Sequence, residues 1–497
     1  MPKSNVRSKA LISLIALPFL ATSFFWVMSI NDVSDLQVGA AFALLCIPWV
    51  AYQRWRLGAR EEVPLFPLIG FAYWVFFALP LFWGDRNALG SLMVRRILSD
   101  EAITSAVLMS LLGVLAIWSG MKVKLGRLLS PKNMPDIPAN PSRWGYLRLI
   151  LILGTLVSSF EAAPHMLGEG GRQIMVIFGR VIPLVAFAIL FREYVNGNST
   201  KADKRLIFGF IIFRFLIGIA TGWLGAFALL IVTCAVIYLS QRKRVPRLAI
   251  AGVIVYVLFF QVGKSAVREK YWYDNPDADY IERADFWVST SSAMWYGALT
   301  GSSEESVRDL AYQSLSRLSL LTQTANVLEL TPSVIPYQHG RLYSYMAVTL
   351  IPRLIWPDKP SVTESNHFYQ LSYGLTSEEN LDRVSIGVGF LTESFINFGW
   401  LGVILIMFTL GVLLDFLQKT FLNQDSSLLF WGIGIALLPS FLTIESQLAQ
   451  YLGGLVQKIL FTCFIFLPII RFKERQRIST EVLKREESAA LPNPSHL

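Results

Sequence analysis

Residues 223–240 read WLGAFALLIVTCAVIYLS and contain no charged side chain. A helix of about 20 apolar residues crosses the hydrocarbon core of a bilayer. Similar runs recur along the chain: apolar and aromatic residues make up 54% of its 497 positions and charged residues 16%, against roughly 25% charged residues in soluble proteins. We therefore predict an all-α polytopic membrane protein, and we exclude a cytosolic enzyme, a disordered chain and a nucleic-acid-binding domain.

Apolar runs of spanning length predict about twelve transmembrane helices. They lie at residues 10–30, 36–52, 65–83, 102–120, 144–162, 174–192, 206–220, 223–240, 248–263, 399–417, 427–445 and 450–470. Only Thr221 and Gly222 separate the seventh run from the eighth, and this break fits either a tight hairpin or one long tilted helix. The first run is longer than the apolar core of a signal peptide, so we expect an uncleaved helix.

Lysine and arginine predict the orientation, because short cytoplasmic loops are enriched in them. With the N-terminus in the cytoplasm, the cytoplasmic segments hold 26 of the 44 basic residues and the short outer loops hold 4. A further 10 lie in one long outer segment and 4 inside predicted spans. Both termini are therefore expected in the cytoplasm, and the net charge of +9 is explained by basic cytoplasmic loops.

The predicted organisation has four parts. Residues 1–263 hold spans one to nine with short loops, 264–386 form one large outer loop, 387–471 hold spans ten to twelve, and 472–497 form a charged cytoplasmic tail. The outer loop has 15 acidic and 10 basic residues, so it is net negative.

Two segments of this loop have distinctive patterns. Apolar residues recur at helical spacing from Val307 to Ala325 and predict an amphipathic helix, which lies either on the membrane face or against the rest of the loop. Three prolines within residues 352–360 exclude a continuous helix there and predict a re-entrant or interfacial segment. Its Arg353 and Lys359, with Trp356, either contact a lipid phosphate or anchor the loop at lipid headgroups.

Three motifs follow one another in the chain. Tyr337-Gln-His-Gly-Arg341 precedes Ile351-Pro-Arg-Leu-Ile-Trp-Pro-Asp-Lys-Pro360, and residues 387–402 then read GVGFLTESFINFGWLG. In this order they resemble the bacterial oligosaccharide repeat-unit polymerases of the Wzy, or O-antigen polymerase, type. The detailed match covers residues 337–402, and the rest of the chain resembles the family in its many spans and its large, late outer loop. A pattern common in that family, arginine followed by glycine eleven positions later, is absent at Arg172 and Arg341.

The resemblance implies a GT-C-like membrane glycosyltransferase in the bacterial inner membrane, with its active site facing the periplasm. Such enzymes transfer a growing glycan from undecaprenyl pyrophosphate to another lipid-linked repeat unit without a nucleotide sugar. Lipid-linked oligosaccharides and membrane lipid are the implied partners, with room for a chain-length regulator protein. An O-antigen ligase, which uses a different acceptor, and a flippase or transporter of the lipid-linked oligosaccharide remain open as alternatives.

This chemistry limits the types of side chain at the site. Fixed cations stabilise the charge that develops on a pyrophosphate leaving group, and arginine suits this role best. A general base must activate the acceptor hydroxyl. The cationic candidates are Arg172, Arg180, Arg214, Arg268, Arg341, Arg353 and Lys359, with Trp356 beside them, and the candidate bases are Glu393, His339, His367 and Asp358. The four histidines are scattered and form no metal-ligand cluster in the sequence, and we therefore expect chemistry without a metal or cofactor.

Overall fold

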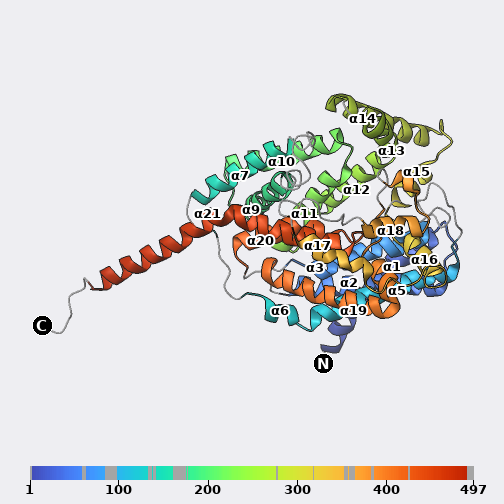
Figure 1. Cartoon of the computed structure of the whole chain (residues 1–497), viewed down its shortest axis with the longest axis horizontal. Coiled ribbons are helices and arrows are strands. Elements are labelled where there is room, and N and C mark those ends of the chain that lie inside the picture. Colours follow the sequence, from blue (N-terminus) through green and yellow to red (C-terminus); the bar gives the residue numbers. More distant parts are fainter. Residues whose placement is uncertain are drawn as a thin grey trace.

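The computed structural model describes residues 3–58, 63–83, 98–131, 137, 142–159, 175, 177–275, 278–316, 318–351, 356, 364–381, 386–423 and 426–489. Within these ranges every regular element is a helix (Figure 1), so the predicted all-α fold is confirmed.

The helices pack into one bundle from which the end of α21 projects (Figure 1). The N-terminal half contains α1 (Lys3–Val27), α2 (Asp35–Leu57), α3 (Leu65–Tyr73), η1 (Trp74–Ala78), α4 (Leu79–Trp83), α5 (Asp100–Lys122), α6 (Leu125–Leu129), α7 (Ser142–Ser159), η4 (Ile177–Val181), α9 (Ile182–Asn196), α10 (Lys201–Ala220) and α11 (Leu224–Arg242). The C-terminal half contains α12 (Arg247–Gln261), α13 (Lys264–Arg268), η5 (Glu269–Asp274), α14 (Tyr280–Thr300), α15 (Val307–Ser316), α16 (Leu321–Leu330), η6 (Arg341–Ser344), α17 (Tyr345–Leu350), α18 (Glu364–Ser372), η7 (Glu378–Asn380), α19 (Phe390–Phe421), α20 (Leu428–Leu442) and α21 (Leu448–Ala489).

Six helical segments in the described part of the chain are long and apolar enough to cross a membrane. They are Asp35–Leu57, Leu65–Trp83, Asp100–Lys122, Leu224–Arg242, Phe390–Phe421 and Leu448–Pro468. The pair formed by α12 and the helix after it, bent by 62°, adds a seventh if it counts as one span. The chain is thus a helical protein with about six candidate membrane spans. A helix lies at each of the twelve predicted spans as well, but their number stays a prediction.

The seventh and eighth predicted spans are separate helices. α10 ends at Ala220 and α11 begins at Leu224, and the two pack against each other. Gly222 in the turn between them has a φ of +71°, a conformation that glycine adopts without strain. The hairpin interpretation of this break is therefore right.

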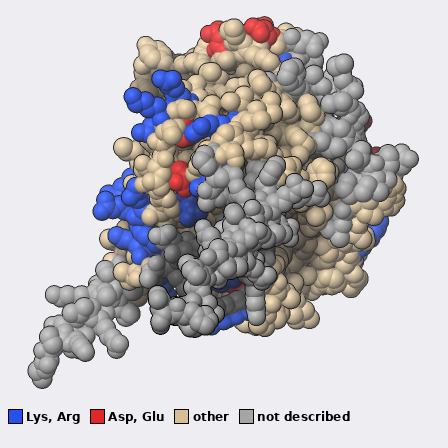
Figure 2. Space-filling model, turned by 90° about the vertical axis from the view of Figure 1, so that its left-hand side faces the viewer, with Lys and Arg blue, Asp and Glu red and all other residues tan. Residues whose placement is uncertain are grey.

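Basic side chains gather at one end of the bundle, which we name the basic end. α2, α5 and α19 end there, where Arg54, Lys122 and Lys419 line one pocket. The turn after α11 joins the same end, because the Lys243 ammonium lies 3.8 Å from the centre of the Trp55 ring. Figure 2 shows Lys and Arg gathered on this face.

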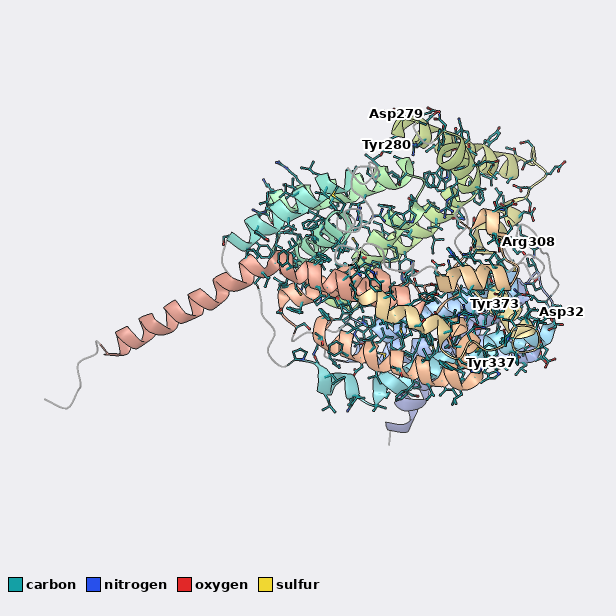
Figure 3. All side chains as sticks on the ribbon, in the orientation of Figure 1. Asp32, Asp279, Tyr280, Arg308, Tyr337 and Tyr373 are labelled. Carbon is teal, nitrogen blue, oxygen red and sulfur yellow. The ribbon has the colours of Figure 1, made fainter. Side chains whose placement is uncertain are left out.

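The opposite end of the bundle, the acidic end, carries the carboxylates that begin several helices. α2 starts at Asp35 and α5 at Asp100, while Glu329 accepts a hydrogen bond from the Ser99 backbone N–H at 3.2 Å. In Figure 3, Asp32, Tyr337 and Tyr373 lie at this end of the molecule. Charge is therefore segregated along the bundle axis.

α5 and α19 approach closely enough for their backbones to touch. A Cβ on Gly120 would lie 3.0 Å from the Gly411 Cα, and a Cβ on Gly411 would overlap the Ile117 carbonyl oxygen. Small residues commonly permit such contact between membrane helices. This pair positions the start of α19, where the candidate site lies.

The single amphipathic helix predicted from Val307 to Ala325 is wrong, because the segment forms two helices, α15 and α16. Ser319 accepts a hydrogen bond from the Thr322 N–H at 3.4 Å and starts the second helix. α16 packs against α5, η1 and α19, and its Leu321 and Ala325 are buried in the protein core. Its apolar face is therefore covered by protein. At the C-terminus, α21 continues through most of the predicted tail to Ala489.

Candidate functional site

α19 is broken at Gly399, whose φ of 65° and ψ of −153° are not helical. A break leaves backbone carbonyls without helical partners. Here the Ile396 and Asn397 carbonyls accept hydrogen bonds from the Gln338 and His339 N–H groups, both at 2.9 Å. Two of the three sequence motifs, distant along the chain, are thereby docked onto each other.

Side-chain contacts reinforce this docking. Asn397 accepts from the Gly340 N–H through Oδ1 at 3.1 Å and donates through Nδ2 to the Glu393 carbonyl at 2.8 Å. A Cβ on Gly399 would lie 3.0 Å from the Tyr337 hydroxyl oxygen, and the Tyr337 ring packs edge-on against Phe395. The broken backbone is therefore held in one conformation.

Glu393 lies in the first turn of α19 and is completely enclosed. Its Oε2 accepts a 2.7 Å hydrogen bond from the N–H of Leu448, the first residue of α21. Its Oε1 has no hydrogen-bond partner among the described residues. Burial, and secondarily the nearby Glu393 charge, raise the pKa of the Tyr343 phenol well above its usual range. Glu393 thus supports the start of α21.

His339 and Arg341 are both exposed. Between them, a Cβ on Gly340 would lie 3.0 Å from the Phe398 ring. Phe398 and Trp400 are 43% and 42% exposed on α19. The predicted base and the predicted cation therefore lie at the protein surface beside aromatic side chains.

A polar pocket of about 190 Å³ lies between α18, the start of α19 and the α20–α21 turn. We name it the Glu445 pocket, and it is lined by Asn366, Gly387, Glu445, Ser446, Gln447 and Gln450. Its walls are joined by two hydrogen bonds: the Gly389 N–H donates to the Glu445 carbonyl at 3.0 Å, and the Ser365 hydroxyl donates to Gln447 Oε1 at 2.9 Å. Gln447, which lines the pocket, directly precedes Leu448. The hydrogen bond that Glu393 accepts from Leu448 therefore supports this wall of the pocket.

Glu445 carries the carboxyl of the pocket. The surrounding protein reduces its hydration and raises the pKa above the ordinary 4.5, against the opposing effect of the Lys264 ammonium. Arg268 is four residues after Lys264 on α13, and residues at this spacing share one helix face. The Glu445 pocket therefore combines a carboxyl of raised pKa with a cationic helix nearby.

Cations also lie within the bundle itself. The Arg180 guanidinium stacks 4.4 Å from the centre of the Trp223 ring, and Arg214 is only 9% exposed. Lys458 on α21 donates a 2.8 Å hydrogen bond to Ser440 of α20, and α21 packs against η4, which contains Arg180. Ser440 lies in the last turn of α20, and Glu445 follows in the turn before α21.

Residues 103–434 match a protein family described as a domain of unknown function, DUF8712. The match covers about two thirds of the chain. The chain belongs to this family. No curated protein and no solved structure matches it. The DUF8712 match begins within α5, includes Arg180, Arg214 and the docked motifs, and ends within α20, before Glu445.

Of the other residues proposed from the sequence, some lie outside the described residues and some lie within them. Arg172, Arg353, Lys359 and Asp358 lie outside the described residues, while Trp356 is 40% exposed and His367 belongs to α18. Among the described residues, no group of three or more His, Cys, Asp or Glu side chains is arranged to hold a metal ion. All the proposed site roles, and chemistry without a metal, stay predictions.

Glu445 is not among the site residues predicted from the sequence, because the predicted span 427–445 includes it. In the structure α20 ends at Leu442, and Glu445 lies in the turn before α21. The polar run Glu445-Ser-Gln447, followed by Gln450 between two apolar runs, is the signal that identifies this turn.

Proposed function

We propose that the chain is a GT-C-like glycosyltransferase of the bacterial inner membrane. It polymerises undecaprenyl-pyrophosphate-linked repeat units into O-antigen, capsule or exopolysaccharide chains. In this proposal all twelve predicted spans cross the membrane, the basic end faces the cytoplasm, and the acidic end with the Glu445 pocket faces the periplasm. Charge segregation along the bundle supports this orientation, since basic residues favour the cytoplasmic side.

One observation carries the proposal: Arg180 on η4 and Lys458 on α21 bring two cations onto packed elements of an apolar bundle, and the α20–α21 turn of the same bundle carries a polar pocket with a carboxyl. Cations at membrane depth are costly and commonly mark functional sites. Two neighbouring positive charges favour a doubly charged anion such as pyrophosphate over a neutral sugar. The docking of the motifs that resemble the polymerases, near the same end of α19, adds support.

The proposed step transfers a glycosyl group. The acceptor hydroxyl oxygen attacks the anomeric carbon and forms the new C–O bond, while its proton passes to the Glu445 carboxylate. The bond from the anomeric carbon to the phosphate oxygen breaks, and undecaprenyl pyrophosphate leaves with the electron pair. Arg180, Arg214 and Arg268 stabilise the charge that develops on this leaving group. A raised pKa suits Glu445 as a base, because proton transfer is efficient when the pKa approaches the working pH.

The test uses the purified full chain in liposomes with lipid-linked repeat units as the only substrate, without nucleotide sugar and with EDTA present. A ladder of lengthened glycans supports the proposal. A requirement for a divalent ion or a nucleotide sugar contradicts the mechanism. Transfer to a lipid A core without lengthening identifies a ligase instead, and transport of unchanged substrate across the bilayer identifies a flippase or transporter.

A further inference from the structure

A charged pocket outside the candidate site lies at the basic end. It has a volume of about 510 Å³ between the last turns of α2, α5 and α19 and the start of α3. We name it the Lys122 pocket. Its lining residues are Ala51, Arg54, Trp55, Gly58, Pro64, Leu65, Phe66, Pro67, Trp118, Met121, Lys122, Lys124, Asp415, Gln418 and Lys419.

The charge of the Lys122 pocket is strongly positive. Its described lining contains four cations, Arg54, Lys122, Lys124 and Lys419, against the single carboxylate of Asp415. Asp415 is 4% exposed, whereas Arg54, Lys122 and Lys124 are exposed at the pocket. The accessible groups are therefore mainly cationic, and the pocket favours an anion.

The frame of the pocket is fixed by contacts between backbones. A Cβ on Gly126 of α6 would overlap the Phe416 N of α19, and the Ser130 and Thr420 hydroxyls lie 2.9 Å apart. The Val63 N–H donates to the Leu422 carbonyl at 3.1 Å and ties the start of α3 to the end of α19. The cations are thus presented from a preformed cavity.

Exposed leucines follow or precede the lining residues in the chain, Leu57 beside Gly58 and those of α6 after Lys124, and we name them the apolar rim. Leu57 at the end of α2 is 85% exposed, and Leu128 and Leu129 of α6 are 82% and 65% exposed. The walls also contain Trp55 and Trp118, and tryptophan is enriched where membranes meet water. A soluble anion would leave this apolar rim in water. A phospholipid would cover the rim with acyl chains and place its phosphate among the cations.

We propose that the Lys122 pocket binds the headgroup of an anionic phospholipid from the adjacent leaflet. The phosphate lies among Arg54, Lys122 and Lys124, and the acyl chains lie against Leu57 and α6. Basic pockets between transmembrane helices on the cytoplasmic side bind anionic lipid headgroups in this way. The site does not depend on the proposed glycosyl transfer, because it lies at the other end of the bundle.

The test measures thermal unfolding of the delipidated full chain in detergent during titration with dioleoyl-phosphatidylglycerol. We expect the anionic lipid to raise the melting temperature, and dioleoyl-phosphatidylcholine or sodium phosphate to have little effect. Equal stabilisation by phosphatidylcholine overturns the proposal. Equal stabilisation by phosphate alone assigns the pocket to a soluble anion and also overturns it.

Variants that change two lysines together test whether phosphatidylglycerol binds at the Lys122 pocket. In Lys122→Gln/Lys124→Gln the apparent affinity for phosphatidylglycerol should fall roughly 30-fold, because each basic residue near an anionic surface contributes about a fivefold factor. Lys122→Arg/Lys124→Arg should retain the affinity. The matched control Lys201→Gln/Lys204→Gln removes two exposed lysines of α10 outside the pocket and should also retain it. Equal losses in both glutamine variants contradict a specific site.

A second measurement needs no variant. Native mass spectrometry of the wild-type chain should show a phosphatidylglycerol molecule that is retained at collision energies that remove phosphatidylcholine. Equal retention of the two lipids contradicts the proposal, whether or not the glutamine variant folds.

Discussion

The backbone N–H of Leu448 donates a 2.7 Å hydrogen bond to Oε2 of Glu393 across 55 positions of sequence. A free N–H at a helix start carries partial positive charge, and an anionic or polar acceptor stabilises it. The carboxyl therefore joins α19 to α21 directly beneath the turn that contains Gln447. In this arrangement Glu393 shapes the Glu445 pocket, while Glu445 itself faces the pocket space.

Substitutions at Glu393 should show whether its carboxyl stabilises the fold or acts as the catalytic base. The amide oxygen in Glu393→Gln can still accept from Leu448, so we expect glycan synthesis within a few-fold of wild type. Glu393→Ala leaves the buried N–H without a partner and should cost about 1–3 kcal/mol of stability. Thermal unfolding in detergent and the glycan ladder measure the two effects. Loss of synthesis in a stable Glu393→Gln variant would return the role of base to Glu393.

Glu445 should control the pH dependence of synthesis. A base acts when deprotonated, so the rate should fall as the pH drops through a raised pKa that lies above 4.5. The folded chain binds this proton more tightly than the unfolded chain, so the carboxyl lowers stability as the pH rises through the same window. Glu445→Gln should remove both dependences and most of the activity. A wild-type pH profile in that variant contradicts the assignment; Glu304→Gln, an exposed carboxyl away from the pocket, is the control.

The two ends of the bundle should face opposite sides of the membrane. Reporter fusions at Asn380 in η7 test the acidic end, and fusions at Gly197, in the turn between α9 and α10, test the basic end. A Cβ at Gly197 meets nothing within 4 Å, so an insertion there disturbs little packing. We expect Asn380 to report the periplasm and Gly197 the cytoplasm. The same side for both positions contradicts the proposed topology.

Local sequence was sufficient for the long apolar helices and insufficient for the break between α15 and α16 and for the site. The run 223–240 predicts α11, observed at Leu224–Arg242, because apolar length alone determines such an element. The break at Gly399 looks like an ordinary helix entry in sequence. The N–H groups that donate to the carbonyls at this break belong to Gln338 and His339, and periodicity holds no information on pairing across such a distance. Glu445 was assigned to a span for a related reason: an apolar count does not show where α20 ends.

Packing of α5 against α19 should be sensitive to one methyl group. In Gly411→Ala the new Cβ would overlap the Ile117 carbonyl, and overpacking typically costs about 1–3 kcal/mol. Gly252→Ala on α12 is the matched control, because a Cβ there meets nothing within 4 Å. We expect a lower melting temperature for the first variant and an unchanged or slightly higher one for the second. Equal melting temperatures would show that the two helices separate easily.

Arginines within the bundle should contribute to the rate rather than to assembly. Arg180 stacks on Trp223 near Lys458, so Arg180→Ala removes a fixed cation from the proposed pyrophosphate position. The expected loss is about 2–4 kcal/mol of transition-state stabilisation, or roughly 30- to 1000-fold in rate. Arg180→Lys keeps the charge but loses the forked donors, so it should retain part of the activity.

The matched comparison is Arg148, which pairs with Asp203 at 2.8 Å near the basic end. Arg148→Ala breaks an ion pair between α7 and α10, so it should lower the melting temperature while leaving the rate per folded molecule unchanged. The surface arginine Arg341 gives a third case, since its exposed position next to Gly340 in the docked motif suits contact with incoming substrate or anchoring at headgroups. Glycan ladders at matched protein level distinguish the three. A normal ladder from Arg180→Ala together with a strong loss from Arg341→Ala would move the pyrophosphate site from the bundle interior to the docked motif at the surface.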